Sequence, residues 1–160
     1  MYRHFLYILI GPKGSGKTHI GGLIDIHTDI HFLRVEPVWL DLEPGEDGWD
    51  KVADAVDTAF QTNGKVMIES LGAGDGFRHM LDRLKSRYPT RLVKVAAAPD
   101  TCLERVRTRD GRDHIPVSDE KVAAYNRVAA QVEYPWDAVI DNEGPASSAA
   151  ILSTIRAISE

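Results

Sequence analysis

Eight residues near the start of the chain, Gly11-Pro12-Lys13-Gly14-Ser15-Gly16-Lys17-Thr18, have the types and spacing needed to hold phosphate groups. They fit the pattern G-x-x-x-x-G-K-S/T at every defined position. The glycines allow successive backbone N–H groups to converge on one anion, and a helix that begins there adds its partial positive charge. Lys17 would supply a cation for the β- and γ-phosphates of a nucleotide, and Thr18 a hydroxyl for Mg²⁺. We therefore expect all eight residues to bind a nucleotide.

Carboxylates lie where two further strands are expected to end, and they could complete the chemistry of such a site. Glu69 follows the apolar run Val66-Met67-Ile68, so we expect it to face Thr18 and to contribute to a magnesium shell. Asp is the usual residue at such a position, so the longer Glu side chain puts direct metal contact in doubt. Glu36 and Asp41 follow the second expected strand, and either could orient an acceptor hydroxyl and accept its proton. Solvated surface charge is the alternative for all three.

Basic residues form a third group that could take part in binding and catalysis. Arg105 and Arg109 are four residues apart, share a helix face and point toward a polar break at 110–117 that contains His114. Guanidinium groups in front of such a loop can close over a triphosphate and stabilise charge on the transferred phosphoryl group. We therefore expect both arginines to take part in nucleotide binding and catalysis. A solvated basic helix face is the alternative.

These residues need a scaffold, and the apolar pattern predicts an α/β fold. Expected strands alternate with helices and cover residues 5–10, 31–38, 65–69, 91–97 and 138–140. Asp75 is expected to cap the helix that follows the third strand. Such alternation demands parallel strands joined by helical crossovers, in three layers with helices on both faces of the sheet. Ligands of these sheets bind at the carboxyl ends of the strands, where the residues above would meet.

The composition of the chain limits which classes of protein it can belong to. The chain has 160 residues, enough for one domain, and it is 43% hydrophobic and 27% charged. A net charge of −5 disfavours a nucleic-acid partner held by bulk charge. Cys102 is the single cysteine and cannot form an internal disulfide. We find no apolar stretch long enough for a membrane helix and no signal-peptide pattern, so the cytoplasm is the expected location.

The chain resembles the small P-loop kinases. The resemblance is carried by the phosphate loop and by the run Cys102-Leu103-Glu104-Arg105 through Arg109 and His114. This group includes gluconate, shikimate and nucleoside-monophosphate kinases, and the basic helix is most similar to gluconate-kinase-like and related AAA-type kinases. The resemblance implies a five-stranded sheet in the order 2-3-1-4-5 within a single domain, residues 1–160, with a short lid at about 109–117. It also implies that Arg105 and Arg109 touch ATP, and that the turn Asp141–Pro145, which includes Asn142, lies beside the adenine.

The acceptor is not defined by this resemblance. No D-x-D follows the second expected strand, as it would in shikimate kinases, and the long lid of adenylate kinases is missing. The leading hypothesis is an ATP- and Mg²⁺-dependent phosphotransferase that acts on a hydroxyl or phosphate of a small molecule, as a monomer or homodimer. One alternative is a nucleotide-binding or nucleotide-hydrolysing regulator, although the N-K-x-D motif for guanine is absent. A second is a nucleic-acid-end kinase, which the acidic charge weakens.

Overall fold

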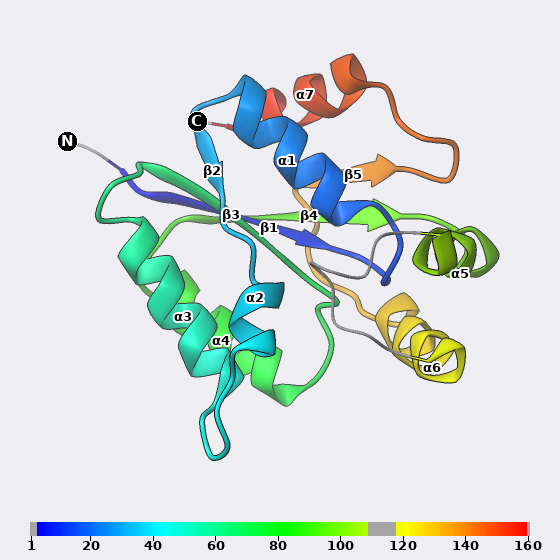
Figure 1. The fold of residues 1–160 in the computed structure, drawn as a ribbon. Helices are drawn as coiled ribbons and strands as arrows, with labels where there is room; N and C mark the ends of the chain where they lie inside the picture. The colour runs from blue at the N-terminus through cyan, green and yellow to red at the C-terminus, as the bar shows by residue number, and fades with distance from the viewer. Residues whose placement is uncertain (1–2, 109–117, 160) are drawn as a thin grey trace.

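The computed structural model describes residues 3–108 and 118–159, in which each of five strands is followed by one or two helices (Figure 1). The strands are β1 (Phe5–Ile10), β2 (Ile30–Phe32), β3 (Lys65–Ser70), β4 (Thr90–Ala96) and β5 (Ala138–Asp141). The helices are α1 (Lys17–His27), α2 (Glu36–Leu40), α3 (Gly48–Ala59), α4 (Asp75–Lys85), α5 (Pro99–Thr108), α6 (Asp119–Ala130) and α7 (Ser148–Ala157). Over these residues, no helix combines the length and the apolar character that crossing a bilayer requires.

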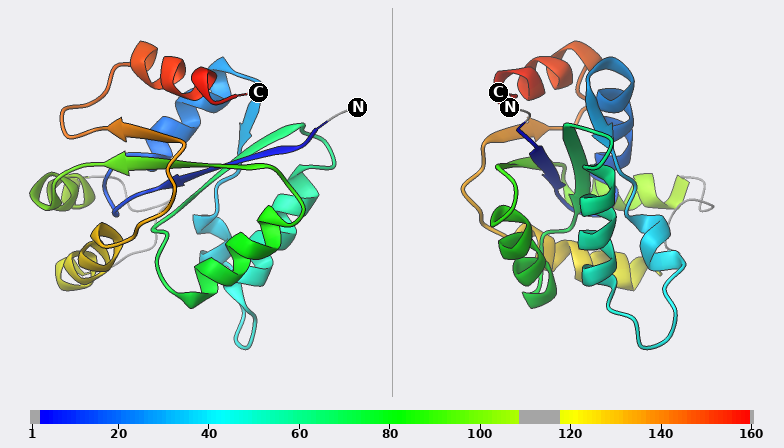
Figure 2. Two further views of the ribbon diagram at one scale, coloured as in Figure 1. Left: turned by 180° about the vertical axis from the view of Figure 1, so that it is seen from behind. Right: turned by 90° about the vertical axis from the view of Figure 1, so that its left-hand side faces the viewer.

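The strands form one five-stranded sheet in the order β2-β3-β1-β4-β5, and every neighbouring pair is parallel. In the register of this sheet, Ile8 of β1 lies opposite Ile68 of β3 and Leu92 of β4. Helices α1 and α7 cover one face of the sheet, and α3 and α4 cover the other (Figures 1 and 2). The predicted three-layer α/β fold and the implied strand order are both confirmed.

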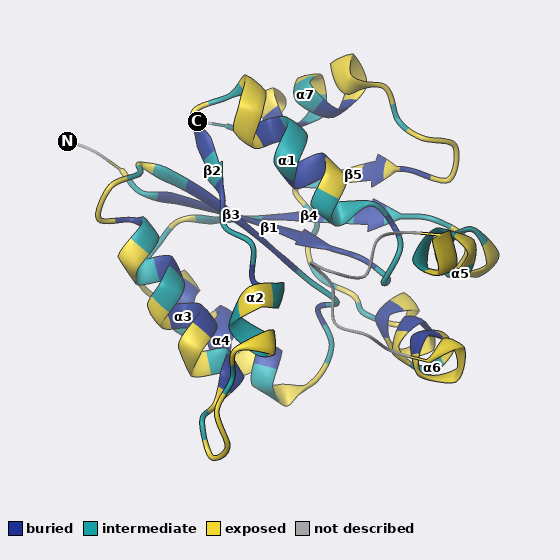
Figure 3. Cartoon of the chain, viewed as in Figure 1, coloured by how far each residue is buried: buried dark blue, intermediate teal, exposed yellow. Residues whose placement is uncertain are grey.

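The central strand β1 shows why the sheet must be covered on both sides. All six of its residues are buried (Figure 3), and its side chains alternate between two cores. Leu6, Ile8 and Ile10 join the core beneath α3 and α4, whereas Tyr7 and Leu9 join the core beneath α1 and α7. A continuous apolar run is therefore the sequence pattern that a central parallel strand requires.

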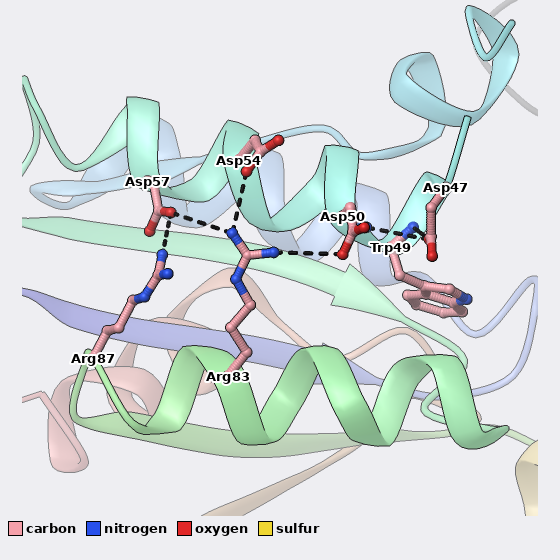
Figure 4. A network of polar contacts seen from close by, with 7 residues as sticks. All are labelled: Asp47, Trp49, Asp50, Asp54, Asp57, Arg83 and Arg87. Carbon is pink, nitrogen blue, oxygen red and sulfur yellow. Dashed lines mark hydrogen bonds and ion pairs between the residues drawn. The ribbon is translucent and has the colours of Figure 1, made fainter. Parts of the chain in front are cut away.

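Helices α3 and α4 are joined across their exposed edges by a network of charges (Figure 4). Arg83 of α4 lies 3.4 Å from Asp50, 3.2 Å from Asp54 and 4.0 Å from Asp57, and Arg87 pairs with Asp57. The aspartates recur at helical spacing, which places all three on the edge of α3 that faces α4. Each exposed pair contributes at most about 1 kcal/mol, so the network orients the two helices more than it stabilises them.

The second strand is shorter than the sequence predicts. Strand β2 ends at Phe32 instead of continuing to residue 38, and Glu36–Leu40 forms the helix α2. Pro37 lies in the first turn of this helix, where its missing N–H group has no helical partner to lose. Glu36 therefore begins a helix and does not end a strand, so the prediction for residues 33–38 is wrong.

The predicted cap of α4 is also wrong. Gly74, with a φ of 92°, occupies the N-cap position, and no side chain caps this helix. Asp75 is instead the first helical residue, and its carboxylate lies 4.0 Å from Arg78. A carboxylate in the first turn still interacts favourably with the helix dipole.

Two adjacent glycines of α1 provide a matched test of this packing. A Cβ on Gly21 would lie 2.4 Å from Cε1 of Phe32 in β2, whereas a Cβ on Gly22 would meet nothing within 4 Å. We expect Gly22→Ala to raise the free energy of unfolding by about 0.5–1 kcal/mol, because alanine favours a helix. We expect Gly21→Ala to lower it by about 1–3 kcal/mol, because the buried ring must move. Urea unfolding measures both, and equal effects would contradict this packing of α1 on β2.

Candidate functional site

The phosphate-loop residues connect β1 to α1 at the carboxyl edge of the sheet. Gly14 and Gly16 have φ values of 87° and 102°, which L side chains rarely adopt. A Cβ would also lie 2.2 Å from the carbonyl oxygen of Cys102 at the first position and 2.3 Å from Nδ2 of Asn142 at the second. The first N–H groups of a helix have no partner within the helix, and no side chain caps α1, so these groups can bind an anion. The loop thus has the backbone form that anion binding requires.

An asparagine far along the chain holds one side of this loop. Asn126 of α6 accepts a hydrogen bond from the backbone N–H of Lys13 at 2.8 Å and donates one to the carbonyl oxygen of Lys13 at 3.1 Å. The side chain of Asn126 is buried, so these bonds form away from competing water. Nothing in its local sequence marks Asn126 as functional, so this residue was not predicted to belong to the site.

Arg105 and Asn142 hold the loop from its other side. The guanidinium of Arg105 donates to the carbonyl oxygens of Gly14 and Ser15, at 3.4 and 3.3 Å, and to that of Asn142, at 2.7 Å. The buried Asn142 side chain donates to the carbonyl oxygen of Ser15 at 2.8 Å. Both residues were expected to contact the nucleotide, and both lie against the loop that would carry it. Arg105 also borders the cavity described below.

Lys17 lies folded back on the loop. Its ammonium donates to the carbonyl oxygens of Gly11 at 2.7 Å and Pro12 at 2.9 Å. Desolvation lowers the pKa of Lys17 from its usual 10.5 to about 8, and the nearby carboxylate of Glu69 opposes that change. The ammonium is therefore charged at neutral pH, and loop carbonyls hold it beside the anion-binding backbone.

Thr18 and Glu69 meet as the sequence predicts. The hydroxyl of Thr18 lies 3.1 and 3.2 Å from the two carboxylate oxygens of Glu69, whose side chain is buried at the end of β3. In the described chain, no three His, Cys, Asp or Glu residues gather in a way that could hold a metal ion. Mg²⁺ in nucleotide sites needs only one or two protein ligands beside phosphate oxygens and water. Thr18 and Glu69 fit that requirement.

A cavity of about 710 Å³ opens from the phosphate loop and extends between α2, α3, α4 and the segment after β3. Outside the phosphate loop, its described lining consists of His19, Val35, Glu36, Trp39, Trp49, Val52, Glu69, Ser70, Leu71, Ala73, Met80, Arg105 and Tyr125.

Of the two carboxylates expected to orient an acceptor hydroxyl, Glu36 borders the cavity, whereas Asp41 does not belong to its described lining. Asp41 lies exposed at the C-terminal end of α2. The two tryptophans were not identified from the sequence, because their common wall forms only when α2 packs on α3. Arg109, His114 and the expected lid at 109–117 lie outside the described residues.

Comparison with known proteins finds similarity in structure alone. No protein-family model matches the sequence, and no curated protein resembles it significantly. The tunicamycin resistance protein of Deinococcus radiodurans superposes with a TM-score of 0.69 at 18% identity, over 98% of this chain and 96% of that one. Shikimate kinase from Acinetobacter baumannii, in complex with shikimate, gives a TM-score of 0.64 at 17% identity, over 98% and 93% of the chains.

A gluconokinase from Sinorhizobium meliloti gives a TM-score of 0.58 at 15% identity, over 97% of this chain and 89% of that one. At these identities the likeness concerns the fold, and it extends over nearly the whole length of each protein. The expected resemblance is therefore confirmed at that level: the chain has the fold of the small P-loop kinases.

Proposed function

We propose that this chain is a phosphotransferase that moves the γ-phosphate of MgATP to a hydroxyl group of a small molecule. The observation that carries the proposal is a continuous cavity that begins at the phosphate loop and extends to the walls formed by α2, α3 and α4. The loop end of the cavity suits a triphosphate, and the far end leaves room for an acceptor beside it. An in-line transfer needs both at once.

Each part of the site has a role in this proposal. The backbone N–H groups of residues 14–18 bind the phosphates, and Lys17 turns from the loop carbonyls toward them. Thr18 and Glu69 would hold Mg²⁺, which neutralises phosphate charge when bound. Glu36 lines the acceptor end, and we propose that it orients the hydroxyl and takes its proton late in the transfer.

The basic residues are proposed to act around this centre. Arg105 keeps the loop in its binding form and borders the nucleotide, and Arg109 remains a proposed contact to the transferred phosphate. The backbone beside Asn142 would border the adenine, while its amide supports the loop. A cytoplasmic location and a monomeric or homodimeric state also remain predictions.

The alternative functions have weaker support. A nucleotide-binding regulator needs no pocket for a phosphate acceptor, whereas here the cavity continues from the phosphate loop to α2, α3 and α4. A nucleic-acid-end kinase would need cations along the acceptor channel to meet a phosphodiester backbone. In the described lining, helices α2, α3 and α4 contribute no lysine or arginine to that part of the cavity.

The proposal is tested by nucleotide turnover. The purified chain should bind MgATP and release ADP faster when a suitable alcohol is present. Lys17→Ala should abolish this turnover while circular dichroism shows an intact fold, because its ammonium is placed to contact phosphate. His27→Ala, at the far end of α1, is the matched control and should keep the wild-type rate. A folded Lys17→Ala protein with full turnover would exclude the phosphate-loop role.

Amide substitutions separate the two carboxylate roles. Glu36→Gln should lower the acceptor-dependent rate by about 10²–10³-fold at every magnesium concentration, because proton transfer is lost. Glu69→Gln should also lower the rate, but excess Mg²⁺ should restore part of it, because the defect lies in the metal shell. Glu43→Gln, on the exposed loop after α2, serves as the control. If Asp41→Asn lowers the rate and Glu36→Gln does not, the hydroxyl role belongs to Asp41.

The lowered pKa of Lys17 predicts how stability depends on pH. The pKa of Lys17 is about 8 in the folded chain and about 10.5 in the unfolded chain, so the folded chain binds this proton more weakly. Protonation of Lys17 therefore lowers the free energy of unfolding. This penalty is complete below pH 8 and fades as the pH rises toward 10.5. Relative to Lys17→Met, the wild-type protein should therefore gain about 2 kcal/mol of unfolding free energy between about pH 7 and about pH 9.5. Urea unfolding of both proteins at the two pH values measures this gain, and a constant difference would contradict it.

A further inference from the structure

The acceptor end of the cavity has an aromatic wall. The ring centroids of Trp39 in α2 and Trp49 in α3 lie 5.0 Å apart with an interplanar angle of 80°. Val52 and Met80 extend this surface, and all four side chains border the cavity. Edge-to-face tryptophans present flat apolar surface that packs well against another ring.

Close packing against two glycines holds this wall in place. A Cβ on Gly48 would lie 2.0 Å from Cζ3 of Trp39, and a Cβ on Gly76 would lie 2.3 Å from Nε1 of Trp49. Asp47 caps α3 by accepting a hydrogen bond from the backbone N–H of Trp49 at 2.9 Å (Figure 4). Both rings are thus positioned before any ligand arrives, which lowers the entropic cost of binding.

The charges around the cavity are unevenly distributed. In its described lining, the lysines and arginine are Lys13, Lys17 and Arg105, which belong to the phosphate loop or bond to it. The carboxylates of Glu36 and Glu69 border the same cavity. Because Glu69 lies beside Thr18 at the phosphate end, an acceptor with its own carboxylate or phosphate would meet Glu36 and, in the described lining, no cation from α2, α3 or α4. Burying a charge without a partner is costly, so such acceptors are disfavoured.

We propose that the acceptor is an alcohol carried on an uncharged, apolar, planar group, whose ring packs on Trp39 and Trp49 while its hydroxyl points toward the phosphate loop. This inference rests on the proposed phosphotransferase function. In the reaction, the hydroxyl oxygen bonds to the γ-phosphorus and the bond from that phosphorus to the β–γ bridging oxygen breaks. The hydroxyl proton passes to a carboxylate of the site, and ADP and the phosphate ester leave.

A matched set of probes tests the preference directly. Benzyl alcohol, 4-(hydroxymethyl)benzoate and gluconate are titrated by saturation-transfer NMR into the full chain with Mg²⁺ and a non-hydrolysable ATP analogue. Benzyl alcohol should bind in the millimolar range expected for so small a ligand. The benzoate, which differs by one carboxylate, and gluconate should both bind at least about ten-fold more weakly.

Substitutions at two glycines connect this preference to the aromatic wall. Gly48→Ala should weaken benzyl alcohol binding by about ten-fold, because the new methyl group displaces the Trp39 ring. Gly22→Ala makes the same chemical change on α1 in open space and should bind like the wild type. If Gly48→Ala does not fold, Trp39→Ala serves in its place, with Trp39→Phe expected to recover part of the affinity.

The outcomes distinguish this inference from the function on which it rests. If the wild-type chain binds no ATP analogue, the phosphotransferase proposal fails and this inference fails with it. If the analogue binds but benzyl alcohol does not saturate, the acceptor inference alone is overturned. It is also overturned if the benzoate or gluconate binds as well as benzyl alcohol, or if Gly48→Ala and Gly22→Ala behave alike.

Discussion

The phosphate loop depends on side chains that come from outside it. A backbone with two residues at positive φ has little regular hydrogen bonding of its own, so ordering it has an entropic cost. Asn126 of α6 holds Lys13 by both its N–H and its carbonyl group, and Arg105 of α5 and Asn142 hold the next two carbonyls. Helices α5 and α6 lie side by side at this edge of the sheet (Figures 1 and 2). The form of the anion site therefore depends on the docking of the C-terminal third of the chain.

The parallel sheet supplies the second condition for the site. Because β1 and β3 are adjacent and in register, the strand that leads into the loop ends next to the strand that carries Glu69. This adjacency brings the Glu69 carboxylate to the Thr18 hydroxyl although the two residues are 51 positions apart. The opposite wall follows from the packing of α2 on α3 and of α3 on α4. The paired arginines and aspartates orient α3 relative to α4. One cavity thus joins a polar phosphate end to an apolar end.

Much of the fold could be predicted because parallel sheets leave strong patterns. The continuous apolar run in β1 predicts a strand that is buried on both faces of a sheet. Helical patterns separate such runs, which predicts parallel strands joined by helices. The error at β2 has a definite cause: Leu33, Val35 and Val38 are apolar because they pack on the core beneath α3, and not because they continue the strand. A short run of apolar residues indicates that their side chains are buried, but it does not distinguish a strand from a helix.

By itself the sequence determined the phosphate loop, the buried strand before it and the helix after it, because these features depend on neighbours only a few residues away. Glu69 could also be predicted, since the end of a buried strand is visible in the sequence and its sheet neighbour follows from topology. The tertiary structure alone decided that Arg105 and Asn142 hold the loop, that Asn126 joins them and that Trp39 meets Trp49. The bonds between Asn126 and Lys13 join residues 113 positions apart. No local periodicity encodes such a partner, because hydrogen bonding and ring packing depend on side-chain positions that exist only once the helices have docked on the sheet.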